Sequence, residues 1–148
     1  MNTKRILIIQ GHPDIDEQHL CHQLAHSYQQ AAESAGHQVQ LLEIGKLEFP
    51  VLRSRKEWES SDVCADIQAA QRALKGKSTR IIVTMGMPGW FYYGVYMAHS
   101  LRSLVRNILS FTGFGPNRTT VFGLAEGMTE KRYQRYMEKV AALGRKGV

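Results

Sequence analysis

Short runs of consecutive apolar residues alternate along this chain with longer segments whose apolar residues recur at helical spacing. The first run covers residues 6–9, and Leu20, Leu24 and Tyr28 then follow at intervals of four. An apolar run without polar alternation is typical of a strand buried on both faces, as in a parallel sheet. The alternation of strand and helix patterns therefore predicts an α/β domain with a parallel sheet.

The same alternation continues to the end of the chain. We expect strands at residues 5–10, 37–44, 80–84 and 119–124. We expect helices at residues 20–35 and 62–74, in a segment that ends at Gly113, and after Thr129. The first two strands with their helix form a βαβ unit, whose crossover should be right-handed. Residues 45–61 show no regular pattern, which indicates an excursion over the surface with some local helix.

Length and composition limit the class of protein. The chain has 148 residues, of which 43% are hydrophobic and 22% charged, so we expect one globular domain over residues 1–148. No apolar run approaches the roughly 20 residues that span a bilayer, and the start lacks a secretory signal pattern. We therefore expect a cytoplasmic protein with no transmembrane segment.

The net charge of +6 raises the possibility of an anionic partner. The basic residues are scattered, however, and no nucleic-acid-binding module is recognisable. We therefore expect no nucleic-acid partner. Nucleic-acid binding stays open as a weaker alternative that rests on charge alone.

The loop after the first strand, residues 11–19, leads into a helix N-terminus, where backbone N–H groups favour anions. The loop contains neither of the two common glycine-rich phosphate motifs. His12 is a candidate hydrogen-bond donor to a phosphate. The alternative is a surface histidine that bonds a backbone group.

Two cysteines, Cys21 and Cys64, do not form a disulfide framework. We expect both to be reduced thiols and Cys21 to be buried. His22 and His26 are four apart on the first helix, the spacing of a possible metal pair. Because no third ligand is evident from the sequence, we favour a solvent-facing stripe.

The loop after the third strand contains Gly86 and Gly89, which let a planar ligand approach the backbone closely. An aromatic cluster follows, in which Tyr92, Tyr93 and, further on, His99 are candidates to face that ligand. A tyrosine and a histidine together can stabilise the charge that develops during hydride transfer. The alternative is an aromatic core beneath the loop, with His99 as an ordinary helix residue.

These segments together resemble the flavodoxin-like NAD(P)H:quinone oxidoreductases. The resemblance covers nearly the whole chain and rests on residues 6–14, 19–25, 74–78, 83–88 and 108–114. It implies a three-layer sandwich with a parallel sheet. It also implies a homodimer that holds FMN or FAD, which NAD(P)H reduces and a quinone-like small molecule oxidises.

The resemblance also implies roles for individual residues. Those implied to bind the flavin are His12, Glu17, Gln18, His19, Leu20, Thr84, Gly86 and Met87. Those implied to stabilise the reduced flavin are Tyr92 or Tyr93 together with His99. The phosphate loop departs from the Ser-Phe-Asn of many members, because residues 17–19 read Glu-Gln-His here.

A larger departure lies near residues 73–75. The family has a central strand there, with a loop that grips one side of the flavin, whereas this chain runs from Gln71-Arg72-Ala73 directly into residues 74–77. The missing part amounts to about 30 residues or more, the size of a βαβ unit. We therefore expect an internal deletion and a four-stranded sheet in the order 2-1-3-4. A non-catalytic binding protein that has lost part of the flavin site is the alternative function.

Overall fold

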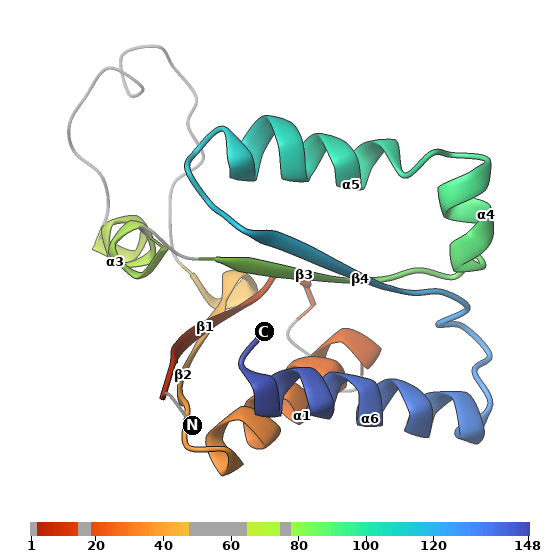
Figure 1. The fold of residues 1–148 in the computed structure, drawn as a ribbon, viewed down its shortest axis with the longest axis horizontal. Helices are drawn as coiled ribbons and strands as arrows, with labels where there is room; N and C mark the ends of the chain where they lie inside the picture. Colours follow the sequence, from red (N-terminus) through yellow and green to blue (C-terminus); the bar gives the residue numbers. More distant parts are fainter. Residues whose placement is uncertain (1–2, 15–18, 48–64, 75–77) are drawn as a thin grey trace.

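Figure 1 shows the chain as a computed structural model, which describes residues 3–14, 19–47, 65–74 and 78–148. The strands are β1 (Arg5–Gln10), β2 (Gln38–Glu43), β3 (Thr79–Thr84) and β4 (Asn117–Phe122). The helices are α1 (Leu20–Ser34), η1 (Ile44–Lys46), α3 (Ala65–Leu74), α4 (Gly89–Gly94), α5 (His99–Ser103), η2 (Leu104–Ser110) and α6 (Glu130–Lys146). This order confirms the expected α/β class. The expectations for residues 48–64 and 75–77 lie outside the described ranges.

The strands form two parallel pairs. In the first pair Arg5 lies opposite Gln38 and Gln10 opposite Glu43, and in the second pair Thr84 lies opposite Phe122. In each pair, a helical crossover carries the chain back to the edge where the first strand began. The second strand starts at that edge, so the two strands run parallel. The carboxyl ends of the paired strands therefore lie at one edge of each pair.

The expected continuous order 2-1-3-4 is wrong. β1 pairs with β2 and β3 pairs with β4, but β1 and β3 do not pair with each other. Both strands instead line a cavity of about 540 Å³, whose floor includes Leu24 and Tyr28 of α1. Paired strands lie about 4.8 Å apart, so two strands with such a cavity between them are too far apart to pair.

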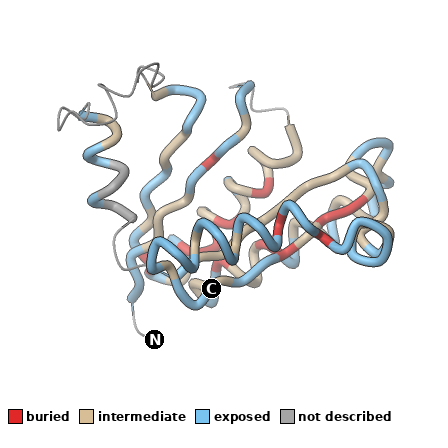
Figure 2. Tube along the Cα trace, turned by 90° about the horizontal axis from the view of Figure 1, so that it is seen from above, coloured by how far each residue is buried: buried red, intermediate tan, exposed pale blue. Residues whose placement is uncertain are grey.

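Helices cover β3 and β4 from two sides, which gives three layers. In Figure 1, α1 and α6 lie on one side of these strands, and α4 and α5 lie on the other. α3 lies at the end of the molecule near the start of β3. Figure 2 shows that buried stretches are short and that exposed or intermediate residues make up most of the trace.

The main core lies between α1, α6 and β4. Leu24, Phe122 and Val140 are almost fully buried, and Tyr28 and Ala32 complete the cluster. Leu24 and Tyr28 come from the predicted helical stripe, and Val140 comes from the predicted core side of the last helix. This part of the core was therefore readable from periodicity.

α1 and α6 approach each other closely at a glycine. A Cβ atom at Gly144 would collide with the carbonyl oxygen of Tyr28 and would lie 3.3 Å from the Cβ of Ala31. The Ser27 hydroxyl donates to the Met137 carbonyl at 3.4 Å across the same contact. Small residues at this crossing allow the close packing of the two helices.

The layer formed by α4 and α5 is less complete. Ala98 and Leu101 are buried, but Trp90 is 75% exposed and Phe111 is 86% exposed. Leu104 and Ile108, in the widened turns of η2, are also exposed, so the helical segment that was expected to end at Gly113 buries only part of its apolar residues. None of the helices in the described ranges is both long and apolar enough to cross a membrane.

Candidate functional site

The loops after β3 and β4 extend the strand pairing beyond the sheet. The Met85 N–H donates to the Phe122 carbonyl at 3.0 Å, and the Leu124 N–H donates to the Met87 carbonyl at 3.1 Å. Leu124 takes a left-handed conformation with φ of 55°, which turns the chain just after this bond. The two loops therefore form one unit at the carboxyl edge of the pair.

Gly123 explains why this unit packs so tightly. A Cβ atom at Gly123 would lie 2.5 Å from the nitrogen of Gly89 and 2.7 Å from the carbonyl oxygen of Met87. Both of these are backbone atoms and cannot move aside as a flexible side chain would. Only glycine fits here, a requirement that the sequence patterns did not single out.

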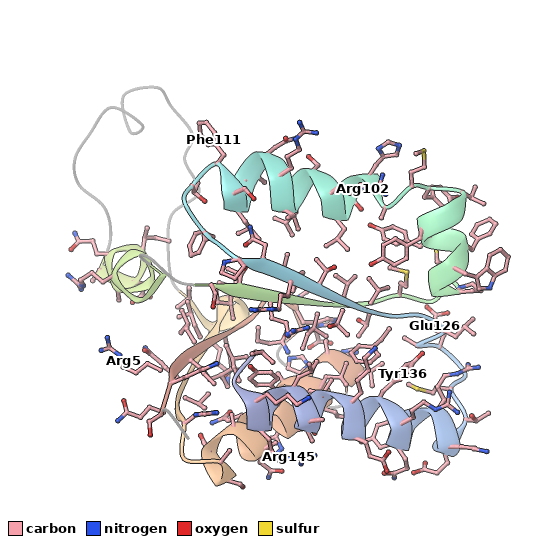
Figure 3. The ribbon with its side chains drawn as sticks, viewed as in Figure 1. Arg5, Arg102, Phe111, Glu126, Tyr136 and Arg145 are labelled. Atoms are coloured by element: carbon pink, nitrogen blue, oxygen red, sulfur yellow. The ribbon has the colours of Figure 1, made fainter. Side chains whose placement is uncertain are left out.

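Gly86 is exposed on this edge, and one acidic side chain stands over it. A Cβ atom at Gly86 would lie 3.3 Å from Oε1 of Glu126. Figure 3 shows Glu126 at the end of the strands nearest α4. No sequence pattern points to Glu126, since it lies in the loop after β4, far along the chain from Gly86.

The two tyrosines of the aromatic cluster have different surroundings: the Tyr92 hydroxyl is hydrogen-bonded, and Tyr93 is exposed. The Tyr92 hydroxyl lies 2.7 Å from the Ser100 hydroxyl and accepts the Leu101 N–H at 3.3 Å, so it holds the start of α5. Tyr93 is 45% exposed, and its ring centroid lies 5.8 Å from that of Tyr92. His99 is the exposed first residue of α5. Tyr92 thus bonds Ser100, the residue after His99, and not His99 itself. The structure therefore brings the predicted residues Tyr92 and His99 into the same region of the molecule.

The turn before α5 is held in an unusual backbone conformation. Met97 and Ala98 have φ of 50° and 49°, in the left-handed region that side chains disfavour. The Ala98 N–H donates to the Tyr92 carbonyl at 3.1 Å, and Ala98 is buried. The surrounding contacts therefore fix α5, with His99 at its first position, against α4.

His12 is anchored within the first loop. Its backbone N–H donates to the side-chain oxygen of the buried Gln10 at 3.1 Å, and its Nδ1 accepts the Asp14 N–H at 3.2 Å. His19, the residue before α1, places Nε2 2.9 Å from the Asp14 carboxylate. Asp14 thus pairs with a histidine at the start of α1. Predicted residues Glu17 and Gln18 lie outside the described residues.

Leu20 lies at the border of the core. It packs against the buried cluster and also lines a shallow hollow of about 500 Å³ between the starts of α1 and α6. Thr84 and Met87 lie at the other loop: Thr84 is half-buried at the end of β3, and Met87 is 37% exposed. Thr84 lines the 540 Å³ cavity, as does Gln10 at the end of β1.

The opposite end of that cavity is basic. The Arg80 guanidinium donates to the Thr120 hydroxyl at 2.9 Å, while its buried Nε has no hydrogen-bond partner among the described residues. Burial lowers the pKa of Arg80; its attraction to Tyr28 opposes this shift, and Arg118 adds to it. Burial also raises the pKa of Tyr28 above 10.0, against a smaller opposing effect of Arg80.

Comparison with known proteins decides the family. The sequence matches the family described as having a flavodoxin-like fold over residues 4–73 and 61–143, so the two matched ranges share residues 61–73. The chain belongs to the flavodoxin-like fold family. The three-layer arrangement around parallel strands agrees with this membership, and it confirms the fold class predicted from the sequence. No curated protein matches the sequence of this flavodoxin-like chain significantly.

Solved structures share this flavodoxin-like fold at low sequence identity. An NAD(P)H:quinone oxidoreductase from Methanothermobacter marburgensis has a TM-score of 0.81 at 12% identity, covering 97% of this chain and 96% of its own. A protein from Klebsiella pneumoniae described as a quinone reductase has a TM-score of 0.73 at 16% identity, with 96% and 83% covered. An azoreductase from Bacillus anthracis has a TM-score of 0.62 at 13% identity, with 98% and 100% covered. At these identities the similarity concerns the fold.

Proposed function

We propose that this chain is a flavin-dependent oxidoreductase that passes hydride from NAD(P)H to a quinone-like acceptor. Membership of the flavodoxin-like family supports the proposal, as do structural neighbours that are a quinone oxidoreductase and an azoreductase. Fold alone does not establish an activity, so the case depends on the site.

The observation that carries the proposal is the cavity between β1 and β3. Its volume of about 540 Å³ lies within the roughly 300–1,000 Å³ of small-molecule and cofactor sites. Apolar side chains of both strands line it, and Gln10 and Thr84 reach it from the carboxyl ends. Ligands of open α/β sheets bind beyond the carboxyl ends of the strands, and Gln10 and Thr84 mark that edge of the cavity.

The first loop fits the phosphate end of the same cofactor. His12 and His19 lie beside the N-terminus of α1, and the first backbone N–H groups of a helix have no partner within the helix. We therefore propose that His12, His19 and Leu20 contact the phosphate side, with Glu17 and Gln18 as further sequence-based candidates.

In this proposal the loop after β3 contacts the ring of the flavin. Thr84, Gly86 and Met87 border the ring, where Gly86 permits close approach of the backbone. Tyr93 and His99 are exposed side chains that are free to face the ring, and they stabilise negative charge there. When bound, FMN or FAD supplies the hydride chemistry that protein side chains lack.

Tyr92 has a different part in this proposal. Because its hydroxyl already bonds Ser100 and the Leu101 N–H, it positions α5 and with it His99. A Tyr92→Phe variant should therefore act through the placement of His99. Tyr93→Phe should act on the reaction itself.

Two further proposals accompany the function. An internal deletion near residues 73–75 is supported by the overlap of the two matched ranges and by the unpaired facing edges of β1 and β3. A homodimer is supported by the exposed apolar side chains of the α4 and α5 layer, Trp90, Tyr96 and Phe111. A dimer would remove these side chains from water.

An activity assay tests the proposed function. Oxidation of NADH and NADPH is followed with menadione as acceptor, with and without added FMN or FAD. We expect turnover above the rate of free flavin, and a loss of about tenfold or more in His99→Gln, as is typical when a group that stabilises developing charge is removed. His26→Gln is the matched control, because His26 is an exposed histidine on α1. Rates equal to the flavin blank for both nucleotides would refute an oxidoreductase.

One observation favours the alternative of a binding protein without turnover. The Glu126 carboxylate lies over Gly86, where it would repel negative charge on a reduced ring. If this repulsion operates, Glu126→Gln should bind reduced flavin more tightly than the unmodified chain. Flavin binding without quinone reduction in both proteins would favour this alternative.

A further inference from the structure

The start of α1 gathers histidines from two segments of the chain. The ring centroid of His12, in the loop after β1, lies 4.3 Å from that of His19 and 5.3 Å from that of His22. The His19 and His22 centroids lie 5.9 Å apart. The sequence had suggested only His22 with His26, which is exposed and one turn further along the helix.

Cys21 adds a thiol to this group. One donor atom from each of His12, Cys21 and His22 lies within 4.8 Å of the other two, and all three residues are half-buried. The Cys21 sulfur lies 3.9 Å from Nδ1 of His22. The group thus combines two imidazoles and one thiol, the donor types found in zinc sites.

The donor atoms lie within about 1 Å of the separations that a tetrahedral zinc site requires. Zinc–nitrogen distances of about 2.0–2.1 Å and a zinc–sulfur distance of about 2.3 Å place the donors roughly 3.3–3.8 Å from one another. The present donors need to close by about 1 Å, which side-chain rotation can supply. The bond from His12 N–H to Gln10 fixes the backbone on one side, and the first turn of α1 fixes it on the other.

We propose that His12, Cys21 and His22 bind a Zn²⁺ ion, with the fourth position open to water. Thiolate and imidazole donors select zinc over Mg²⁺ and Ca²⁺, which prefer oxygen. Binding displaces the thiol proton of Cys21 to solvent, because the thiolate is the ligand.

This site goes beyond the proposed function and does not depend on it. His12 belongs both to the zinc site and to the proposed phosphate contact, so one side chain serves two ligands. The test therefore uses flavin-free full-length protein. Failure of zinc binding would leave the flavin proposal standing, and failure of flavin binding would leave the zinc site standing.

The experiment titrates metal-free protein with Zn²⁺ in competition with a chromophoric chelator. We expect one ion per chain, with no displacement of Zn²⁺ by Mg²⁺ or Ca²⁺. His12→Asn and His22→Asn should each weaken binding by about tenfold or more, since each removes one ligand. His26→Asn is the matched control on the same helix and should leave affinity unchanged. Equal losses in His26→Asn, or no binding to the unmodified chain, would overturn the proposal.

Two measurements on cysteine complete the test. With Co²⁺ in place of Zn²⁺, the unmodified chain should show a thiolate-to-cobalt charge-transfer band that Cys21→Ser lacks and Cys64→Ser retains. In the unmodified chain, Zn²⁺ should slow alkylation of Cys21 much more than that of Cys64. This second measurement stands even if Cys21→Ser does not fold. Alkylation of Cys21 at the same rate with and without Zn²⁺ would overturn the site.

Discussion

The two faces of the β3–β4 pair are packed very differently. On the side of α1 and α6, Phe122 of β4 and Val140 of α6 are 1% and 0% exposed. On the side of α4 and α5, Trp90 and Phe111 remain 75% and 86% exposed. The first face forms a closed core, whereas the second leaves large apolar surface in water. The stability of the domain therefore comes mainly from the first face.

The difference has a cause in the helices themselves. α1 and α6 are long, regular and carry small residues at their crossing, such as Ala31, Ala32 and Gly144. α4 and α5 are short, are joined by the left-handed residues Met97 and Ala98, and continue in widened turns. Short helices with irregular joints bury less area, and they also present exposed side chains for a ligand or a second subunit.

The largest expected effect comes from removing the centre of the closed face. Phe122→Ala should lower the free energy of unfolding by about 3–5 kcal/mol, because the cavity left by a buried aromatic ring refills poorly. Denaturant unfolding followed by far-UV circular dichroism measures this loss. A loss below about 1 kcal/mol would show that the closed face is not the main source of stability.

A smaller effect is expected where the two long helices cross. Gly144→Ala should lower the free energy of unfolding by about 1–3 kcal/mol, since the added methyl group meets the Tyr28 carbonyl oxygen and forces the helices apart. Gly127→Ala would not be a fair control because Gly127 has positive φ. Glu138→Ala, on the exposed side of α6, is a better control and should change stability little.

Alkaline pH should weaken the closed face through Tyr28. Burial raises the pKa of Tyr28 above 10.0, so the fold favours the neutral phenol. This contribution is full below pH 10, the pKa of an unfolded tyrosine, and is lost as pH rises through the higher folded pKa. Tyr28→Phe, which also loses the bond to the Val148 carbonyl, should show a shallower fall in stability above about pH 10. Parallel pH curves for the two proteins would contradict this assignment.

The smallest effect is expected on the open face. Phe111→Ser should change the free energy of unfolding by no more than about 0.5 kcal/mol, because the ring is already in water. If the open face is a dimer interface, the same variant should shift the sedimentation velocity profile toward monomer. A stability loss as large as that of Phe122→Ala would remove the contrast between the faces.

Much of the fold could be predicted from the sequence because it is encoded locally. The apolar run of β1 and the periodic stripes of α1 and α6 lie within single segments, and Thr129 stands at the predicted start of α6. The relation between β1 and β3 could not be predicted in this way. Whether the edges of β1 and β3 meet depends on how α1 packs between them. The apolar pattern within a single segment does not contain that information.

The site was predictable only in part for the same reason. His12, Gly86 and His99 stand out by residue type and by position after a strand. Glu126 over Gly86 is a contact between residues 40 apart, and the Tyr92 bond to Ser100 spans a turn with left-handed residues. The grouping of His12 with Cys21 and His22 depends on how the loop after β1 folds back on α1.

Equilibrium titration with FMN and FAD tests the central claim, that the carboxyl edge beside β1 and β3 holds a flavin. Visible absorbance and flavin fluorescence report the bound fraction. We expect saturable binding of at least one flavin, weakened about tenfold in His12→Ala by loss of a charge-assisted bond to phosphate and unchanged in His26→Ala. Absence of a saturable change with both flavins, in protein that shows the unfolding transition of a folded domain, would contradict the claim.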